Sequence, residues 1–300
     1  ENAYLSPNIA VLRQNCRDVT AQYTHCDIDQ AIFGLVTLSS PLANHSNAVR
    51  NTFFTNHRKQ SAGWFATNWA HRIDKNTTFQ NYCEYPIVST IADSMTYPNG
   101  INTLVAFCCH GGDNQEDSCV INQSSVDRGL FNQIHYNYEK AELDKNEQFG
   151  NPDYARTLDI KKGAIYEHCE NGFIKLHTVV RKDYVLIVKA AKIPKPMDQY
   201  QFVDKSVIYR ANEEVFVEAV VVARNDEDNL IAKVKYSAFR PINVGDKLSS
   251  RTGNKGIIAK RVLAHEMPYT ADGLTPDILV NCHSLPKRMA VNQMLAGLLG

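Results

Sequence analysis

The stretch INTLVAFCCHGGDNQEDSCVI, residues 101–121, consists of an apolar run, a glycine-rich turn with adjacent carboxylates, and a second apolar run. The pattern predicts strands at Ile101–Cys109 and Cys119–Ile121. Glu116 and Asp117 then follow a strand end, where site residues commonly lie. Adjacent residues of an extended chain point to opposite sides, so at most one of these carboxylates faces a given metal ion. Because Mg²⁺ takes about six oxygen ligands, such a carboxylate contributes to a site without completing it.

A second stretch, GDKLSSRTGNKG at residues 245–256, places two lysines and an arginine among glycines. Lys247, Ser249, Arg251 and Lys255 have odd numbers, so an extended chain displays them on one face. Backbone donors near glycine and the point charge of lysine are the usual groups that hold phosphates. The spacing is not that of a P-loop, which requires G-x-x-x-x-G-K-[ST]. A metal-binding carboxylate together with a cradle for polyphosphate is what a nucleotidyl-transfer centre needs.

The composition is that of an ordinary globular protein of roughly two domains. The chain has 300 residues, of which 44% are hydrophobic and 21% charged, and its formal net charge is zero. Overall charge therefore does not decide whether a nucleic acid is a partner, but the basic stretch 246–261 and the acidic stretch 139–153 indicate different neighbours. No apolar run reaches membrane-spanning length, and no signal peptide opens the chain. Because the chain begins at Glu1 without methionine, we expect a piece of a larger protein.

The cysteines show no spacing typical of a zinc site. There are eight of them: Cys16, Cys26, Cys83, Cys108, Cys109, Cys119, Cys169 and Cys282. Because no C-x-x-C pair is present, we expect no zinc within this chain. The apolar surroundings of several cysteines favour free thiols in a reducing compartment over disulfides. We expect His110 and His283 to form hydrogen bonds, since neither has a carboxylate or cysteine at metal-ligand spacing.

Apolar periodicity predicts a helix from Arg50 to Trp69, because Phe53, His57, Gln60 and Trp64 recur at near-helical spacing. From about residue 132 to 240 the pattern changes to strand-like runs, which predict a separate β-rich insertion. The predicted strands are Phe173–Val180, Tyr184–Val188, Val215–Val222 and Leu230–Tyr236. In the last of these, alternation predicts Ala232, Val234 and Tyr236 on one face.

A closing helix is predicted from Pro286, which suits the first turn of a helix. Val291, Leu295 and Leu298 would form its apolar stripe. Arg288 would then lie in the first turn, where an arginine and the helix N-terminus together make a natural anion site.

In this order, the segments resemble the second-largest, β-type subunit of multisubunit DNA-directed RNA polymerases. The segments that carry the resemblance are Arg50-Asn51-Thr52 with Lys59-Gln60, then 112–118, 122–131, 245–256, 267–278 and 286–289. Specific motifs cover about residues 31–131 and 241–300, whereas the β-rich insertion matches only by its position, where the family carries its wall (flap) domain. The sequences of these motifs are closer to those of eukaryotic, archaeal and large-DNA-virus enzymes than to those of bacterial ones.

Two departures from the family pattern favour a viral enzyme, of a poxvirus-like or African swine fever-like kind. Thr252 stands where the family usually has histidine, and Phe53 where an aromatic hydroxyl is common. The lysine segment keeps its charges.

The resemblance implies a mixed α+β fold, with a double-psi β-barrel in the hybrid-binding region that is interrupted by a β-rich wall (flap) insertion. Residues 1–33 would be the end of a preceding external domain. The hybrid-binding domain would comprise residues 34–132 and 241–300, and the wall domain residues 133–240.

The resemblance also implies transcription: an RNA 3′-hydroxyl attacks the α-phosphate of a ribonucleotide and pyrophosphate leaves. Asp117 and Glu116 would hold the second Mg²⁺, shared with the nucleotide and the largest subunit. Lys247 and Lys255 would contact RNA backbone and substrate phosphate. The residues expected to bind substrate are Arg50, Arg288, Lys59, Gln60 and Arg251.

The implied partners are the largest subunit, assembly-platform subunits, template DNA, the RNA transcript and ribonucleoside triphosphates, with no membrane. The permanently bound Mg²⁺ needs an Asp-x-Asp-x-Asp cluster, which this sequence lacks and the family keeps in its largest subunit, so we expect the fragment to be inactive alone. We expect an intracellular location: a cytoplasmic viral factory or virion for a viral enzyme, the nucleus for a eukaryotic one.

Two alternatives remain open at the level of sequence. The first is a non-catalytic β-barrel module that binds nucleic acid or a partner through the basic stretch. The second is a free-standing magnesium nuclease, which requires activity from the isolated chain.

Overall fold

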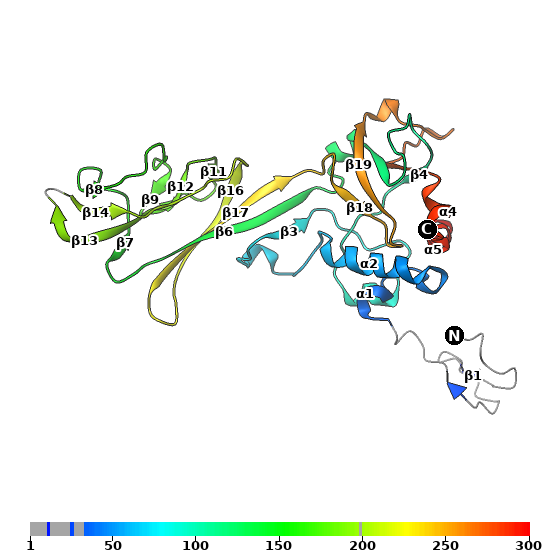
Figure 1. Ribbon diagram of the computed structural model, residues 1–300, viewed down its shortest axis with the longest axis horizontal. Coiled ribbons are helices and arrows are strands. Elements are labelled where there is room, and N and C mark those ends of the chain that lie inside the picture. The colour runs from blue at the N-terminus through cyan, green and yellow to red at the C-terminus, as the bar shows by residue number, and fades with distance from the viewer. Residues whose placement is uncertain (1–10, 13–24, 27–32, 198–199) are drawn as a thin grey trace. The chain divides into compact units, whose positions relative to one another are not determined.

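The computed structural model describes residues 11–12, 25–26, 33–197 and 200–300, and divides the chain into two compact units (Figure 1). Unit 1 comprises Glu1–Ser61, Glu84–Ser125 and Asn243–Gly300, and unit 2 comprises Ala62–Cys83 and Val126–Ile242. Most of the predicted external domain at 1–33, Cys16 included, lies outside the described residues. The fold class is mixed, with several sheets and few helices, as predicted.

Unit 1 contains one five-stranded sheet and most of the helices. The strands of the whole unit are β1 (Val11–Leu12), β2 (His25–Cys26), β4 (Val105–Phe107), β5 (Ser118–Asn122), β18 (Lys247–Ser249), β19 (Lys255–Val262) and β20 (Ile278–Val280). Its helices are α1 (Leu35–Leu38), η3 (Ala43–His45), α2 (Ala48–Gln60), η5 (Ile91–Met95), η6 (Ala264–Glu266), α4 (Ser284–Arg288) and α5 (Val291–Leu299), and α3 (Gln123–Asp127) follows β5.

The sheet of unit 1 has the order β18-β19-β5-β20-β4. β19 pairs with β5 in parallel, β20 pairs with β4 in parallel, and β5 and β20 are antiparallel. The ends of β4, β20 and β18 therefore meet the beginnings of β5 and β19 at one edge of the sheet. Val120 and Leu279, which are register partners, are fully buried in its core. The predicted strand at 101–109 is only the three residues of β4, and β5 extends the one predicted at 119–121 by a residue at each end.

The helix predicted from Arg50 to Trp69 ends at Gln60 as α2. Ser61 is extended, and its hydroxyl donates to the carbonyl of Arg58 over 2.7 Å. Beyond it, within unit 2, Trp69 stacks on Phe79 with the ring centroids 4.4 Å apart. Aromatic packing on a strand therefore overrides the helical spacing of the sequence here.

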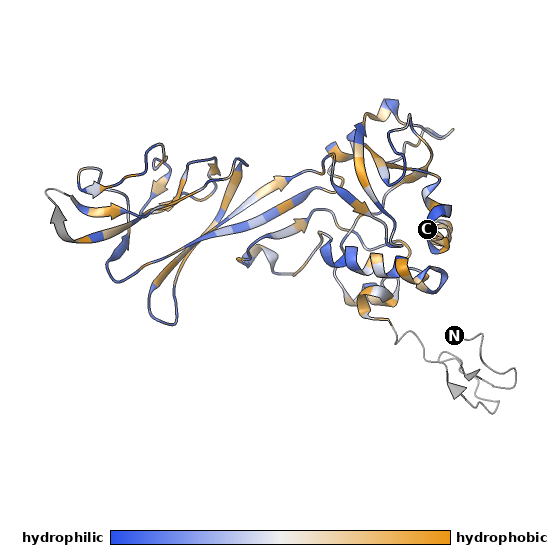
Figure 2. Ribbon diagram, in the orientation of Figure 1, coloured by the Kyte–Doolittle hydropathy of each residue, from blue (hydrophilic) through white to orange (hydrophobic). Residues whose placement is uncertain are grey.

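The prediction of one closing helix with Arg288 in its first turn is wrong. The chain forms two helices, and Arg288 is the last residue of the first, α4. Met289 then adopts a left-handed φ of 51°, which ends α4 before α5 begins. Of the predicted apolar stripe, Leu298 is exposed and Val291 is half exposed, and Figure 2 colours much of α5 as hydrophobic. No helix among the described residues is both long and apolar enough to cross a membrane.

The regular secondary structure of unit 2 consists almost entirely of strands. These are β3 (Thr77–Gln80), β6 (Gln133–Glu142), β7 (Glu147–Phe149), β8 (Thr157–Leu158), β9 (Cys169–Glu170), β10 (Phe173–Ile174), β11 (Val179–Val180), β12 (Val185–Ile187), β13 (Lys189–Met197), β14 (Tyr200–Asp204), β15 (Val207–Ile208), β16 (Val215–Arg224) and β17 (Leu230–Arg240), with η4 at Trp69–His71. They form three sheets, of orders β11-β16-β17-β6-β3, β15-β12-β10-β9 and β7-β13-β14-β8.

The strands predicted for the β-rich insertion are found with changes at their ends. The run predicted at 173–180 is two short strands, β10 and β11, in different sheets. β12 is one residue shorter at each end than predicted, and β16 and β17 are longer. Ala232, Val234 and Tyr236 are buried, as the alternation predicted.

Lys235, on the opposite face of β17, is also buried. Its ammonium group donates to the Ala70 carbonyl over 2.9 Å and lies 4.5 Å from the ring centroid of Tyr136. Residues 62–83, assigned from the sequence to the hybrid-binding domain, thus belong with the β-rich unit, where β3 pairs with β6. The assignment of named domains stays a prediction.

The buried carboxylate of Glu147 joins strands of unit 2. Lys189 and Lys205 lie 2.6 and 2.7 Å from its oxygens. Burial by itself raises the pKa of Glu147, but hydrogen bonds from Lys189, Lys205 and the backbone N–H of Asp144 outweigh it and lower the pKa to about 2.

We predict that unit 2 becomes less stable as the pH is lowered, because Glu147 becomes protonated. Because its folded pKa lies below the unfolded value, the stabilisation is complete above about pH 4.5 and is lost as the pH falls towards 2. Glu147→Gln should remove roughly 1–3 kcal/mol of this dependence. Urea unfolding followed by tryptophan fluorescence measures it, since Trp64 and Trp69 both lie in unit 2. Glu170→Gln, at an exposed ion pair with Lys175, is the matched control. Parallel pH curves for Glu147→Gln and the unmutated chain would contradict the assignment.

Candidate functional site: one edge of the unit 1 sheet

The register of the unit 1 sheet brings the two motifs together. Ser118 pairs with Ile257, and the Ile257 N–H donates to the Asp117 carbonyl over 2.9 Å. Across the β18–β19 hairpin, Ser249 pairs with Lys255. The acidic turn and the lysine segment, about 130 residues apart in sequence, therefore meet at the same sheet edge.

The acidic turn is held by the buried side chain of Asn114, which is 1% exposed. Its carbonyl oxygen accepts from the His110 N–H over 2.9 Å, and its amide donates to the Cys108 carbonyl over 2.7 Å. Glu116 has a left-handed φ of 53°, which is uncommon for a residue with a Cβ. Glu116 and Asp117 both face solvent. The turn therefore presents its carboxylates outward on a fixed backbone.

Arg288 connects the acidic turn with the lysine segment. Its guanidinium donates to the Lys255 carbonyl over 3.2 Å and to the carboxylate of Asp117. The Arg288 side chain is 7% exposed, whereas that of Asp117 is 61% exposed. Burial, and then the nearby charge of Arg50, lower the pKa of Arg288. Arg288 thus joins Asp117 to the backbone of Lys255, and the charge of Arg50 acts on Arg288.

The ring of Phe53 contacts two of these cations. The Arg50 guanidinium is 5.3 Å and the Lys255 ammonium 5.2 Å from the centroid of its ring. The electron-rich face of an aromatic ring attracts a cation, so Phe53 holds two like charges close together. A tyrosine hydroxyl is not required for this role. The sequence predicts Phe53 as a position of a helix and shows it as a departure from the family pattern, but gives no sign of its contact with the two cations.

His57 is a member of the site that sequence reasoning missed. Its ring stacks on Phe53 with centroids 6.2 Å apart, and its Nδ1 lies 3.0 Å from the Ser249 hydroxyl. Burial, followed by the charges of Lys255 and Lys247, lowers the pKa of His57. The available signal was its position four residues after Phe53, on the same face of α2.

Arg251 does not point to the same place as the lysines. Its guanidinium lies 2.6 Å from Asp93 and 2.6 Å from the Val88 carbonyl, and also donates to the Ser39 carbonyl. Burial lowers its pKa. The expected single extended face breaks at the turn between β18 and β19, so this geometry favours a structural role for Arg251.

The remaining predicted residues lie at the end of α2, where Lys59 and Gln60 are exposed. By helical periodicity Gln60 falls on the face of Arg50, Phe53 and His57, whereas Lys59 falls on the opposite face. Nearly three turns separate Gln60 from Arg50 along the helix.

Gly253 allows the lysine segment to approach α2. It has φ of 77°, and a Cβ at this position would lie 2.2 Å from the Arg50 carbonyl oxygen. Only glycine fits both conditions without displacement of the backbone. Its neighbour Thr252 is 4% exposed and shares a 2.8 Å hydroxyl contact with Ser250.

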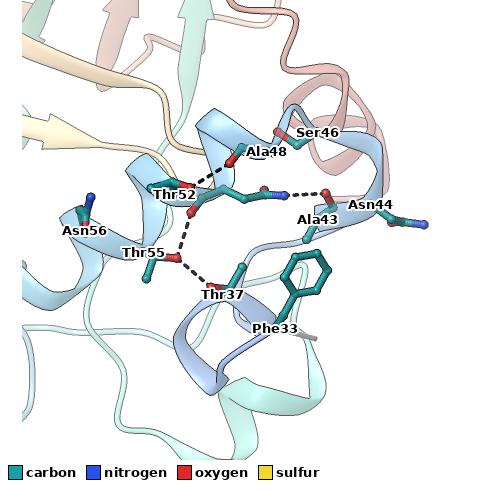
Figure 3. A pocket seen from close by; sticks show the side chains of 10 residues that line it. Phe33, Thr37, Ala43, Asn44, Ser46, Ala48, Thr52, Thr55 and Asn56 are labelled. Carbon is teal, nitrogen blue, oxygen red and sulfur yellow. Dashed lines mark hydrogen bonds between the residues drawn. The ribbon is translucent and has the colours of Figure 1, made fainter. Parts of the chain in front are cut away.

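A pocket of unit 1 lies apart from this edge. It has a volume of about 460 Å³ and is lined by Phe33, Thr37, Ala43, Asn44, Ser46, Ala48, Asn51, Thr52, Thr55 and Asn56. Figure 3 shows hydrogen bonds among some of its lining residues; Thr37 and Thr55, for example, share a 2.8 Å contact. Its α2 residues lie on the helix face opposite Arg50 and Phe53.

The arrangement suits a polyanion that arrives with a divalent cation. Arg50, Lys247 and Lys255 supply positive charge, and the exposed Asp117 offers a hard oxygen ligand. Because Mg²⁺ takes oxygen ligands from water and phosphates as well as protein, one or two carboxylates fit a shared site and not a complete one.

Comparison with known proteins finds a matching family and relatives named as RNA polymerase subunits. Residues 36–300 match the family described as RNA polymerase Rpb2, domain 6. The chain is 33% identical to DNA-directed RNA polymerase II subunit 2 of Arabidopsis thaliana, over 94% of this chain and 25% of that protein. It is 35% identical to subunit RPB2 of Encephalitozoon cuniculi, over 96% of this chain and 26% of the relative.

A viral relative matches equally well. The probable DNA-directed RNA polymerase II subunit RPB2 homolog of Invertebrate iridescent virus 3 is 33% identical over 100% of this chain and 27% of its own length. The chain thus spans about a quarter of the curated relatives it matches.

We predict that Gly253→Ala destabilises unit 1 by about 2 kcal/mol or more, because the added methyl group meets the Arg50 carbonyl and the backbone needs a positive φ. Gly273→Ala is the matched control: its φ is 81°, but nothing lies within 4 Å of a Cβ there. It should cost only about 1 kcal/mol. Amide hydrogen exchange of β5 and β19 gives both values. Equal losses in the two variants would mean that the contact with α2 is unimportant.

We also predict that removing a neighbouring positive charge raises the pKa of His57. Lys255→Ala and Lys247→Ala should each shift it upward, since both ammonium groups disfavour the imidazolium form. Lys59→Ala, on the opposite face of α2, is the control. An NMR titration of the His57 ring measures the shift; no difference between Lys255→Ala and Lys59→Ala would show that Lys255 is not a neighbour in solution.

Proposed function

Because the chain belongs to the family RNA polymerase Rpb2, domain 6, we propose that it is part of the catalytic centre of a DNA-directed RNA polymerase. In this proposal it acts with the largest subunit in template-directed addition of ribonucleotides to an RNA 3′ end. The observation that carries it is the meeting of Asp117, Lys255, Arg288 and Arg50 at one sheet edge.

The reaction explains why such a group of charges is useful. When a 3′-hydroxyl attacks the α-phosphate and pyrophosphate leaves, negative charge must be neutralised and the reacting groups held in line. No nucleophilic side chain is needed. A cluster of cations with one exposed carboxylate supplies this chemistry, whereas a nuclease of one chain would need a complete set of metal ligands.

Asp117 would contribute a ligand to the second Mg²⁺, and the nucleotide and the largest subunit would provide others. Glu116 could join it, because its left-handed backbone departs from the extended chain on which only one of the two carboxylates faces an ion. When bound, this ion neutralises phosphate charge and stabilises the leaving group. The Asp117 side chain is 61% exposed while it accepts a hydrogen bond from Arg288, so it remains accessible to an ion from solvent.

The arginines and the lysines of this edge would bind different groups. Arg50 and Arg288 would hold the triphosphate, and Lys247 and Lys255 would contact RNA backbone and substrate phosphate. Phosphate oxygens that approach Arg288 compete with Asp117 for its guanidinium, so triphosphate binding and release of the carboxylate are coupled. Gln60 would lie at the margin of this surface, and Lys59 and Arg251 remain candidates that the geometry does not favour.

We further propose that unit 1 contributes strands to a double-psi β-barrel and that unit 2 is the wall (flap) domain. The proposed partners are the largest subunit, assembly-platform subunits, template DNA, RNA and ribonucleoside triphosphates. An intracellular location follows from this function.

Lys255→Ala in the assembled polymerase tests the proposal. Loss of a contact that acts on the transferring phosphates should slow elongation by about 10²-fold or more. Lys260→Ala is the control, because Lys260 lies on the same strand but pairs with Asp113 over 2.9 Å. Rates of single-nucleotide addition on preformed RNA–DNA scaffolds measure the effect.

Unchanged elongation in Lys255→Ala would remove Lys255 from the centre. Equal slowing by Lys260→Ala would mean that general loss of charge, and not position, matters. A polymerase that elongates normally with both Asp117→Ala and Lys255→Ala would favour the non-catalytic module.

A further inference from the structure

Two cysteines meet at the sheet edge beside the acidic turn. β4 and β20 pair in parallel up to Phe107 and Val280, and the Cys108 N–H donates to the Val280 carbonyl over 3.0 Å. Two residues beyond each paired position the chains reach Cys109 and Cys282, whose sulfurs are 3.7 Å apart. The register of a parallel pair, and not the spacing of the sequence, makes them neighbours.

His283 supplies a third atom of a kind that Zn²⁺ prefers. Its Nδ1 lies 3.7 Å from the Cys282 sulfur, and the ligand atoms of Cys109, Cys282 and His283 are all within 4.8 Å of one another. Zn²⁺ prefers cysteine sulfur and histidine nitrogen in a tetrahedral arrangement. Two Zn–S bonds of about 2.3 Å at the tetrahedral angle place the sulfurs about 3.8 Å apart, and a sulfur and a nitrogen about 3.6 Å apart.

The two separations of 3.7 Å match those edges of a tetrahedron. They do not match a disulfide, which requires about 2.05 Å between sulfurs. The cluster is also open on one side, since Cys109 and His283 are exposed and Cys282 is half-buried. An ion can therefore enter, and water can complete the fourth position.

Asn281 fixes the cluster from the interior. Its side chain is 7% exposed, and its Oδ1 accepts from the His283 N–H over 2.9 Å. The same oxygen lies 3.1 Å from His283 Nδ1 and 3.9 Å from the Cys109 sulfur. The backbone bond from His283 to Asn281 orders the chain that carries Cys282 and His283, whereas Nδ1 leaves its contact with Asn281 when it binds an ion.

We propose that Cys109, Cys282 and His283 form a binding site for a thiophilic divalent cation, with Zn²⁺ preferred, separate from the oxygen ligands of Asp117. Sulfur and imidazole select Zn²⁺ over Mg²⁺, which prefers carboxylate and water. The site departs from the expectation that the chain holds no zinc. That expectation rested on local spacing, which cannot detect ligands joined by strand pairing.

An ion here would act as a clip between β4 and β20. Cys109 is followed by the turn that ends at Asp117, and Asn114 ties this turn back to Cys108. Fixing Cys109 to Cys282 therefore also limits the movement of the base of the acidic turn.

Cobalt(II) titration of the reduced 300-residue chain tests the site, because Co²⁺ substitutes for Zn²⁺ and reports thiolate ligands by charge-transfer absorption and tetrahedral geometry by intense visible bands. We expect a saturable signal at one equivalent, removed by added Zn²⁺ but not by Mg²⁺. Cys282→Ser and His283→Gln should each weaken binding by about 10-fold or more.

Cys108→Ser is the matched control, since Cys108 is the adjacent half-buried thiol that packs beside the core around Val120. It should bind Co²⁺ as the unmutated chain does. Circular dichroism confirms folding of each variant, and a raised unfolding temperature with Zn²⁺, seen in Cys108→Ser but not in Cys282→Ser, gives a second readout.

Three results would overturn the proposal. They are no saturable Co²⁺ signal in the reduced chain, undiminished binding in Cys282→Ser, and uptake lost equally in Cys108→Ser. None of these depends on polymerase activity.

Discussion

The close parallel pairing of β5 with β19 is the constraint on which the candidate site depends. Ile257 donates its N–H to the Asp117 carbonyl over 2.9 Å, and a Cβ at Gly256 would lie 3.2 Å from the same oxygen. A larger residue at 256 would separate the two backbones at the point where the acidic turn begins its strand. Since side-chain direction alternates along a strand, a shift of one residue would also turn Lys255 away from Phe53. The glycine and the hydrogen bond thus set the distance between carboxylate and lysine.

The charges at this edge are not balanced within unit 1. Two other cations of unit 1 pair with acids: Arg251 lies 2.6 Å from Asp93, and Lys260 lies 2.9 Å from Asp113. At the edge, Arg288 pairs with Asp117, but among the described residues Arg50, Lys247 and Lys255 have no ion pair with an acid. Gathering like charges costs free energy, which the ring of Phe53 and the carbonyl of Lys255 offset in part. A protein keeps such an excess where a polyanion completes the balance. Burial, and then the charges of Lys255 and Lys247, lower the pKa of His57 at this edge.

The sequence identified the motifs well and their surroundings poorly. Local patterns located β5 and the core face of β17, because strand alternation is a local property. Asp117 and Lys255 come from charge-rich turns, and their functional roles stay predictions, whereas Arg288 was expected in the first turn of a helix that it ends. Where α2 ends could not be predicted, since the packing of Trp69 on Phe79 depends on a distant strand. Arg251 has an odd residue number, as Lys247 and Lys255 do, but it lies in the turn of a hairpin, where the alternation of an extended chain no longer holds. The groups that accept its hydrogen bonds lie more than 150 residues away in the sequence. The only sequence signal for His57 was its helical spacing from Phe53, and residues of a protein core show the same spacing.

The same reasoning explains why one edge of this sheet concentrates chemistry. β4 and β20 end there and β5 and β19 begin there, so every turn at this edge brings polar residues from remote segments together. The turn from Cys109 to Asp117 is held at both ends by such pairings, at one end by β20 and at the other by β19. Its middle is held by Asn114, whose bonds to His110 and Cys108 close the turn upon itself. A carboxylate carried by so constrained a turn loses little conformational entropy on binding an ion, because the backbone that positions it is already ordered.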